Sequence, residues 1–585
     1  MITRNTRVAG RGTHALLLLA MCAGAALPHL GRAPLTLMEA RNFVAAREMA
    51  EGGSWLIPTL NGALRLAKPP LPTWAVAAVL RAAGPDSPDL FLLRLPAALM
   101  LTLLVFFFWG LLRELTREQP GEAEAPGRTA WLGALLLAST FLLITVGREG
   151  QWDIFANSLM IGALWALLRG WRAPAGRAAG WLGLGGLLLG SSLLSKGPVA
   201  LYAVLLPFAA TFFSPLNPRR RAANAPGAGR ARLPGLLLAL GVGLGVGLAW
   251  PAYLAWQREV APAALAVARL EISSWGERHS RPFWFYLNFP VFAGVWAPLA
   301  LAALAAPWAR GRAGRFVPYA LGLGWLLLTL LLLSVVPEKK ERYMLPLLPP
   351  LVLLTAGLLR YLETELRRPA PDVWARRLVR GWAGLLTLAA LLAPVALSRV
   401  PGFGASTAAF WAAAAGFAVV AALVGWQGAG RGRVAAPLAG AVALMGLAVA
   451  LLPAFHAWKS RRYEPGLRTI ADLRANPRLA GLPWRCLEAP APEQVWFAGR
   501  KLPVWPRGAD SALVFPTGPV AVLSRPPRVR PTTAAGRRAN QFATLPAALP
   551  AAWRGRVRRQ VVDSFYLNKN PRDGYWRVTV LRPEP

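Results

Sequence analysis

Residues 90–112 read LFLLRLPAALMLTLLVFFFWGLL, an apolar run in which Arg94 is the one charged side chain. A run of about 20 apolar residues is long enough to cross the hydrocarbon core of a bilayer as an α-helix. Comparable runs recur over the first 453 positions of the chain. We therefore expect an all-α, polytopic membrane domain over residues 1–453.

Thirteen stretches in this region have the length and composition of a membrane span. The first resembles a signal peptide because arginines precede its apolar core, but further spans follow and we interpret it as a retained helix. The expected spans are 12–30, 90–112, 129–147, 152–169, 179–195, 197–214, 235–256, 283–306, 317–336, 343–361, 381–398, 407–426 and 435–453.

The amino-acid composition also favours a membrane protein. The 585 residues are 55% hydrophobic and 16% charged, whereas a soluble chain carries about a quarter charged residues. A net charge of +38 would suggest a nucleic-acid partner in a soluble protein. Here most arginines lie in short clusters between apolar runs, where they record membrane orientation, so we expect no nucleic-acid partner. Cys22 and Cys486 are too few for a disulfide framework or a thiolate metal site.

The arginine clusters occupy alternate loops, and the positive-inside rule assigns those loops to the cytoplasm. This assignment predicts a cytoplasmic N-terminus and an extracytoplasmic C-terminus. The clusters are Arg169, Arg172 and Arg177; Arg219, Arg220 and Arg221; Arg310, Arg312 and Arg315; and Arg367, Arg368, Arg376, Arg377 and Arg380.

Residues 454–585 change to Pro-interrupted, Arg-rich segments without a spanning run. Strand-like pieces at Val520–Leu523, Gln560–Leu567 and Tyr575–Leu581 accompany a helix-like piece at Leu467–Arg474. We expect a small α/β domain on the outer face.

The first outer loop, residues 31–89, is too long for a simple connector and is expected to carry interfacial helices. It holds Glu39, while Asp153 lies in a turn on the same outer side. A carboxylate near the apolar boundary can act as a catalytic base or a metal ligand. The alternatives are a solvated interfacial carboxylate for Glu39 and a local ion pair with Arg148 for Asp153.

Cations gather at the same outer interface, where they suit a lipid-linked phosphate or, alternatively, lipid headgroups in general. The candidates for phosphate binding are Lys339, Lys340, Arg342 and Tyr343, while Lys68 on the same side has a snorkelling lysine as its alternative. Further cavity candidates are Arg41, Arg148, Glu149, Lys196 and His279, of which Lys196 has snorkelling as its alternative. A divalent-metal site formed by Glu39, Asp153 and His279 is a further alternative, although no HExxH or paired-His spacing supports it.

Several short motifs occur together over the membrane portion, to about residue 350. In this order they resemble bacterial lipid-carrier-dependent glycosyltransferases of the GT-C fold, similar to aminoarabinose transferases of lipid A and to protein O-mannosyltransferases. The motifs are Met38-Glu39-Ala40-Arg41 with Arg47-Glu48-Met49; Gly53-Ser54-Trp55-Leu56-Ile57-Pro58; Lys68-Pro69-Pro70-Leu71 with Trp74; Arg94-Leu95-Pro96; Trp152-Asp153; Lys196-Gly197-Pro198; and Arg342-Tyr343-Met344-Leu345-Pro346.

The resemblance implies a bacterial inner-membrane enzyme with a polyprenyl-phosphate sugar donor, an outer-face active site, and a lipid, glycan or protein acceptor. It also implies that Glu39 and Asp153 line the catalytic cavity and that Lys68 lies near the donor phosphate. Two positions depart from the family pattern. Met38 stands where an Asp is common, and Ala67 stands where aminoarabinose transferases have a Glu, which puts their metal site and the acceptor in doubt.

Direct displacement at the anomeric carbon, which inverts it, is the mechanism that these residue types allow. Cations would stabilise the leaving phosphate, and Glu39 or Asp153 would deprotonate an acceptor hydroxyl. A flippase for lipid-linked sugars is an alternative, but it predicts mid-membrane charges and two related halves. A surface-glycan polymerase or ligase is the third interpretation, and no Walker loop indicates use of ATP.

Overall fold

The structure, a computed structural model, describes residues 11–84, 87, 89–214, 228–273, 280–400, 403–460, 476–506, 513–524, 553, 555–566 and 575–584. The chain forms two compact units. The first, here the membrane unit, comprises Met1–Gly31, Leu66–Pro72 and Arg94–Pro453. The second, here the sheet unit, comprises Arg32–Arg65, Thr73–Leu93 and Ala454–Pro585.

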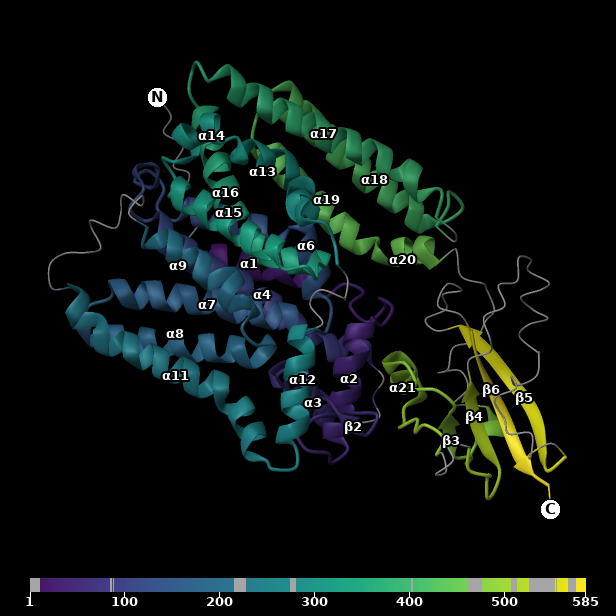
Figure 1. The fold of residues 1–585 in the computed structure, drawn as a ribbon. Coiled ribbons are helices and arrows are strands. Elements are labelled where there is room, and N and C mark those ends of the chain that lie inside the picture. Colours follow the sequence, from purple (N-terminus) through teal and green to yellow (C-terminus); the bar gives the residue numbers. More distant parts are fainter. Residues whose placement is uncertain are drawn as a thin grey trace. The chain divides into compact units, whose positions relative to one another are not determined.

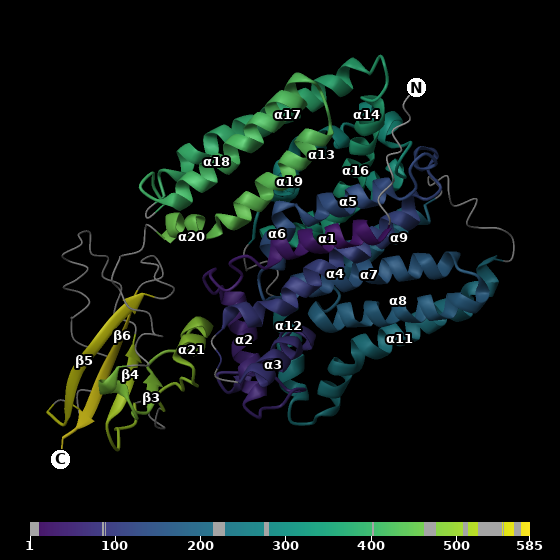
Figure 2. The ribbon, with the colours of Figure 1, turned by 180° about the vertical axis from the view of Figure 1, so that it is seen from behind.

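The membrane unit is built from helices (Figures 1 and 2). They are α1 (Arg11–Ala26), α4 (Leu90–Thr116), η1 (Pro120–Glu122), α5 (Arg128–Ala138), α6 (Phe141–Gly147), α7 (Trp152–Arg172), α8 (Ala175–Lys196), η2 (Leu201–Leu205), α9 (Leu206–Phe212), α11 (Ala228–Trp256), α12 (Ala261–Ser273), η4 (Phe283–Trp296), α13 (Ala297–Leu304), α14 (Ala306–Ala313), α15 (Tyr319–Val335), η5 (Glu341–Leu347), α16 (Leu348–Glu365), α17 (Val373–Leu397), α18 (Ala408–Leu423), η6 (Val424–Gly430), α19 (Ala435–Ala450) and α20 (Leu452–Ser460), whose first two residues belong to this unit.

All thirteen expected spans fall on helices. Within the described residues, eight helices are long and apolar enough to cross a membrane, and the bent pair α5 and α6 makes a ninth if it is one span. The other four expected spans correspond to shorter apolar helices at Gly12–Ala26, Leu201–Phe212, Tyr319–Val335 and Ala435–Ala450. The expectation of a polytopic helical membrane protein is confirmed.

The expected single span over 129–147 is bent by 60° between α5 and α6. The Ser139 hydroxyl donates to the carbonyl of Leu135 at 2.8 Å, and the Thr140 hydroxyl donates to that of Leu137 at 2.9 Å. Such side-chain bonds to the backbone compete with the helical hydrogen-bond pattern. The Ser139 hydroxyl also accepts from the indole of Trp296 at 3.0 Å, which holds the bend against η4.

Helices α8 and α11 pack closely along their length, as both views show (Figures 1 and 2). A Cβ at Gly186 would lie 2.3 Å from the carbonyl oxygen of Ala239, and one at Gly190 would lie 2.7 Å from that of Gly243. Small residues allow such close approach between membrane helices, which lack a hydrophobic driving force for association. The glycines of α8 at this interface therefore allow the two helices to pack closely.

The sheet unit contains a four-stranded sheet in the order β3-β4-β6-β5, in which β3 and β4 are parallel and the other pairs antiparallel. Strands β4, β5 and β6 coincide with the three strand-like segments, so the small C-terminal sheet domain is confirmed. The helix-like segment Leu467–Arg474 lies outside the described residues. The elements of this unit are α2 (Leu37–Ala50), β1 (Thr59–Leu60), β2 (Ala63–Leu64), α3 (Leu71–Ala83), η8 (Pro477–Leu479), β3 (Trp484–Cys486), α21 (Pro492–Ala498), β4 (Val520–Ser524), β5 (Val557–Tyr566) and β6 (Tyr575–Pro583).

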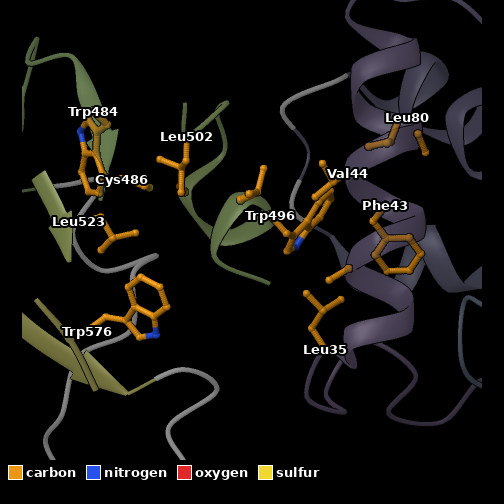
Figure 3. Packing of buried hydrophobic residues seen from close by; sticks show 14 of the residues in the cluster. Leu35, Phe43, Val44, Leu80, Trp484, Cys486, Trp496, Leu502, Leu523 and Trp576 are labelled. Carbon is orange, nitrogen blue, oxygen red and sulfur yellow. The ribbon is translucent and has the colours of Figure 1, made fainter. Parts of the chain in front are cut away.

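The core of the sheet unit joins the first loop to the C-terminal region. Ten of the fourteen residues of α2 are buried, so this helix is enclosed on nearly every face. The rings of Phe43 and Trp496 lie 5.6 Å apart, and Figure 3 places Val44 beside the same indole. The Arg47 guanidinium donates to the carbonyls of Val495 and Trp496 at 3.2 and 3.3 Å.

The hairpin β1–β2 is held from both sides. The Glu48 carboxylate accepts from the Thr59 hydroxyl and from the Gly62 amide. At the tip, the side-chain amide of Asn61 donates to the carbonyl of Leu502 at 2.9 Å and accepts from its N–H at 2.7 Å. Asn61 has a φ of 57°, a left-handed conformation that asparagine tolerates better than most residues. The C-terminal region therefore shapes the first loop.

Candidate active site

The hairpin of α7 and α8 brings together Asp153 and Lys196. Asp153 lies in the first turn of α7, and Lys196 is the last residue of α8. The helix α8 ends there because Gly197 adopts a φ of 71° and Pro198 follows it. The Lys196 ammonium donates to Oδ1 of Asp153. Each charge sits at the helix end whose dipole stabilises it.

Arg342, at the start of η5, completes a buried ion cluster. Its Nε lies 3.3 Å from Oδ2 of Asp153. The side chains of Asp153, Lys196 and Arg342 are 5%, 8% and 20% exposed. Both oxygens of the Asp153 carboxylate therefore face a cation, and the pair with Lys196 is almost free of solvent.

Tyr343 lies among three cations. Its ring centroid is 4.4 Å from Nζ of Lys196, 5.6 Å from Nζ of Lys340 and 5.5 Å from Cζ of Arg342. An aromatic face attracts a cation within about 6 Å, most strongly where water is excluded. The ring thus holds positive charges close together that would otherwise repel one another.

The loop before η5 supplies further polar groups. Lys340 is ion-paired with Glu338, and the Tyr343 hydroxyl lies 3.5 Å from the same carboxylate. The Tyr286 hydroxyl accepts from the backbone N–H of Lys340 at 3.3 Å. Lys68 is near enough to Lys196 for the two charges to interact. The cluster therefore combines Lys68, Lys196, Lys340 and Arg342 with two carboxylates, which leaves an excess of positive charge.

Three of these groups did not stand out in the sequence. Tyr286 lies in an aromatic stretch that is typical of an interfacial belt, and Glu338 is one charge of a turn of mixed sign. Tyr202, in the π-helix η2, is near enough to Asp153 for the charge of that carboxylate to act on its hydroxyl. The signal that could have found Tyr202 is its position six residues after Lys196, just beyond the Gly-Pro break.

Arg148 and Glu149 make contacts of their own elsewhere. The buried Arg148 guanidinium donates to the carbonyls of Ala25, Ala26 and Pro28 at 2.9, 2.7 and 2.5 Å, which fixes the exit of α1. Burial, and then the positive charge of Arg94, lower the pKa of Arg148 to about 10. Glu149 accepts from the side-chain amide of Gln151 at 2.6 Å.

Lys339 differs from its neighbour Lys340. Its ammonium donates to the carbonyl of Val336 at 2.6 Å, and the residue is 4% exposed. Burial lowers the pKa of Lys339. Its contact with the backbone of its own loop indicates a role in shaping that loop.

Glu39 and Arg41 belong to the sheet unit. The Glu39 carboxylate accepts from the N–H of Thr36 at 3.0 Å while its own N–H donates to the Thr36 hydroxyl, and the two form a capping box at the start of α2. Glu39 is fully buried. Nη1 of Arg41 lies 3.9 Å from Sδ of Met38. The carboxylate that the sequence singled out therefore also begins its helix.

The groups around Asp153 do not fit a divalent cation, because both carboxylate oxygens already face cations that would repel it. Over the part of the chain that the structure describes, no group of three His, Cys, Asp or Glu side chains could hold a metal. His279, the third metal candidate, lies outside the described residues.

Two family models match the chain. The model for dolichyl-phosphate-mannose-protein mannosyltransferases matches residues 67–242, and the model for the Alg9-like mannosyltransferase family matches residues 271–409. Lys68, Asp153 and Lys196 fall in the first range, and Arg342 falls in the second. The ion cluster is thus drawn from both matched segments.

Curated relatives are undecaprenyl phosphate-alpha-4-amino-4-deoxy-L-arabinose arabinosyl transferases. The protein of Edwardsiella ictaluri (strain 93-146) is 27% identical over 374 residues, covering 63% of each chain. Transferase 1 of Sodalis glossinidius (strain morsitans) is 30% identical over 384 residues, covering 61% of this chain and 59% of the relative. The chain therefore spans about three fifths of the length of these relatives.

The crystal structure of ArnT from Cupriavidus metallidurans bound to undecaprenyl phosphate has the same fold. It superimposes with a TM-score of 0.64 over 97% of each chain, at 17% sequence identity. The apo form of the same protein gives a TM-score of 0.63. The chain therefore has a GT-C membrane fold, and parts of its sequence are similar to dolichyl-phosphate-mannose-protein mannosyltransferases and to undecaprenyl-phosphate-aminoarabinose transferases.

Proposed function

We propose that this protein is a membrane glycosyltransferase that transfers one sugar from a polyprenyl-phosphate carrier to an envelope lipid, glycan or protein. The observation that carries the proposal is the partly buried cluster of Lys196, Arg342 and Lys340 around Tyr343. When the sugar leaves its carrier, negative charge develops on the phosphate. Preorganised cations in a water-poor site stabilise such a charge strongly.

In this proposal Asp153 is a positioning residue. One oxygen of its carboxylate faces Lys196, and the other faces Arg342. Asp153 holds the two cations at fixed positions, although their like charges repel each other. Charge-assisted hydrogen bonds from these cations to the phosphate oxygens would then bind the donor.

The proposed reaction is a single displacement at the anomeric carbon. The acceptor oxygen forms the new bond as the bond to the phosphate oxygen breaks, and the configuration inverts. Lys196 and Arg342 stabilise the phosphate as it departs with both bonding electrons. Glu39 is the carboxylate proposed to take the proton of a hydroxyl acceptor, a role that a phosphate acceptor would not need.

The names of the curated relatives point to the first donor to test, undecaprenyl phosphate-linked 4-amino-4-deoxy-L-arabinose. We extend to this chain only the donor class, a polyprenyl-phosphate monosaccharide. Met38 and Ala67 occupy positions where the family pattern has carboxylates, and the acceptor is accordingly left as an envelope molecule.

The proposed setting is a bacterial inner membrane, with the N-terminus in the cytoplasm and the sheet unit outside. The support is the alternation of arginine clusters between loops. A reporter fused after residue 460 tests this orientation. A cytoplasmic signal from that fusion would overturn it.

The direct test of function uses the purified full-length protein. It is incubated with a polyprenyl-phosphate sugar and envelope extracts, and mass spectrometry follows both the carrier and the acceptors. We expect release of free polyprenyl phosphate together with one sugar added to an acceptor. Transfer from a soluble nucleotide sugar without a lipid carrier would refute the donor class, and movement of intact lipid-linked sugar without cleavage would identify a flippase.

A further inference from the structure

One end of the hairpin formed by α17 and α18 is rich in exposed arginines. Helix α17 lies beside α18 in both views, and η6 continues α18 (Figures 1 and 2). The first turns of α17 carry Arg376, Arg377 and Arg380, and the segment after η6 carries Arg431 and Arg433. All five are exposed. They are called here the five-arginine cluster.

Tertiary contacts bring the two parts of the cluster together. The Arg380 guanidinium donates to the carbonyl of Gly430 at 3.3 Å. A Cβ at Gly432, the residue between the last two arginines, would lie 3.7 Å from Cγ of Arg376. The start of α17 and the segment after η6 therefore form one surface.

Two exposed tryptophans flank this surface. Cζ of Arg377 lies 5.1 Å from the ring centroid of Trp374, and Cζ of Arg431 lies 4.3 Å from that of Trp426. Both indoles belong to residues that are 59% exposed. Tryptophan is enriched at the level of lipid headgroups, and both helices of the hairpin are candidate membrane spans. The cluster therefore has the composition of a surface at headgroup level.

The cluster has no carboxylate of its own. The sequence contains no Asp or Glu between Asp372 and Glu464. The Asp372 carboxylate already accepts from Arg312, from the Tyr361 hydroxyl and from the N–H of Trp374. Over the part of the chain that the structure describes, no arginine of the cluster forms an ion pair.

The positive-inside rule alone does not account for this arrangement, because it requires only an excess of positive charge in a loop. Two exposed arginines of the preceding loop have carboxylate partners. Arg367 is paired with Glu363 at 3.4 Å, and Arg368 is paired with Glu365 at 2.9 Å. In the five-arginine cluster like charges repel one another without such relief. An anion with more than one charge would remove that repulsion.

An exposed apolar stripe continues from the cluster along α17. Helical spacing places Gly381, Gly384, Leu385 and Leu388 on the same face as Arg377. Both leucines are exposed, and a Cβ at either glycine would have no atom within 4 Å. An acyl chain can therefore lie against the helix directly beyond the arginines.

We propose that the five-arginine cluster binds a phospholipid whose headgroup carries two phosphodiesters, as cardiolipin does. The arginines of α17 donate to one phosphate, and Arg431 and Arg433 donate to the other. The acyl chains lie on the stripe of α17. A lipid with one phosphate would neutralise only part of the cluster, so the lipid with two is favoured. By the orientation proposed above, this lipid belongs to the cytoplasmic leaflet.

The test is native mass spectrometry of the full-length protein, delipidated in detergent and titrated with cardiolipin, phosphatidylglycerol or phosphatidylethanolamine. Arg377→Gln and its combination with Arg431→Gln are compared with Arg367→Gln, the same change at an exposed arginine that has a carboxylate partner. We expect cardiolipin to bind about fivefold more weakly to the single variant and about 25-fold more weakly to the double variant, since each arginine adds a similar attraction to an anionic lipid. The control should bind as the wild type does.

Three outcomes would overturn the proposal. Equal cardiolipin binding by the wild type and the double variant would show that the lipid binds elsewhere. Phosphatidylglycerol binding as tightly as cardiolipin would show that one phosphate is sufficient. An equal loss in Arg367→Gln would indicate general attraction to basic residues.

Thermal unfolding without lipid checks that each variant is folded, and Arg433→Gln replaces Arg377→Gln if the latter is unstable. The rise in unfolding temperature on adding cardiolipin gives a second measure of binding, because a ligand of the folded state stabilises it. We expect this rise to be smaller in the cluster variants than in the wild type and in Arg367→Gln. The same rise in all of them would contradict the proposed site.

Discussion

Lys196 donates a hydrogen bond to Asp153, and this ion pair joins the last turn of α8 to the first turn of α7. The pair is almost fully buried, with Arg342 on the second carboxylate oxygen. A buried charge that loses its partner destabilises a protein by about 3 to 5 kcal/mol. Stability and the proposed donor binding therefore depend on the same three side chains.

Asp153→Asn should lower both transfer and stability, because it leaves Lys196 and Arg342 buried without a counter-charge. We expect the free energy of unfolding to fall by about 3 to 5 kcal/mol. Adding Lys196→Met should recover part of the stability and none of the transfer. Thermal unfolding in detergent measures the first effect and carrier release the second. Asp89→Asn, the same change at an exposed helix start, is the control. Additive effects of the two cluster changes would disprove the coupling.

Tyr343 offers a test of its ring apart from its hydroxyl. Tyr343→Phe keeps the aromatic face toward Lys196, Lys340 and Arg342, whereas Tyr343→Leu removes it. We expect Phe to retain most of the turnover and Leu to lose about tenfold, the equivalent of one partly desolvated cation–π contact. Initial rates at saturating and limiting donor give the comparison. Equal losses in the two variants would assign the effect to the hydroxyl near Glu338.

Glu39→Gln separates helix capping from chemistry. Glutamine at this position still completes a capping box with Thr36, so α2 should keep its stability. We expect transfer to a hydroxyl acceptor to fall by about 100-fold or more, the usual contribution of a general base. Glu39→Ala should lose the cap as well, at a cost of about 1 kcal/mol. Near-normal turnover in Glu39→Gln would show that Glu39 caps the helix and is not the catalytic base.

Trp496→Ala should expose the first loop to proteases, although the change lies in the C-terminal region. The indole packs on Phe43 of α2, and its removal should cost about 3 to 5 kcal/mol. Limited proteolysis followed by mass spectrometry locates the new cleavage sites, which we expect within Arg32–Arg65. Val514→Ala, at an exposed position of the same region, should leave the pattern unchanged. Cleavage confined to the C-terminal region would contradict a shared core.

Transfer should persist in EDTA, because the cations around Asp153 take the place that a metal would occupy. Lys68→Ala should be severely impaired under the same conditions, since Lys68 adds to the positive charge beside Lys196. Measuring turnover with and without the chelator tests whether transfer needs a metal. Complete loss in EDTA, restored by one divalent ion, would show that other ligands hold a metal.

Local properties of the sequence were enough to find the spans and the C-terminal strands. Crossing a bilayer requires only a sufficient apolar length, which the run 90–112 has by itself. The strand-like segments around 520 and 575 alternate or cluster apolar residues and became β4 and β6. The membrane class and the C-terminal sheet could therefore be expected from the residues alone.

Tertiary structure alone decided which charges meet and what each one does. Nothing local to Asp153 indicates that its oxygens face Lys196 and Arg342, or that Arg148 turns away to the carbonyls that end α1. The joining of α2 to α21 through Arg47 was equally absent from sequence periodicity. Periodicity and composition indicate whether a segment lies in water, in lipid or in a protein core. These contacts instead depend on the three-dimensional placement of groups that are far apart along the chain.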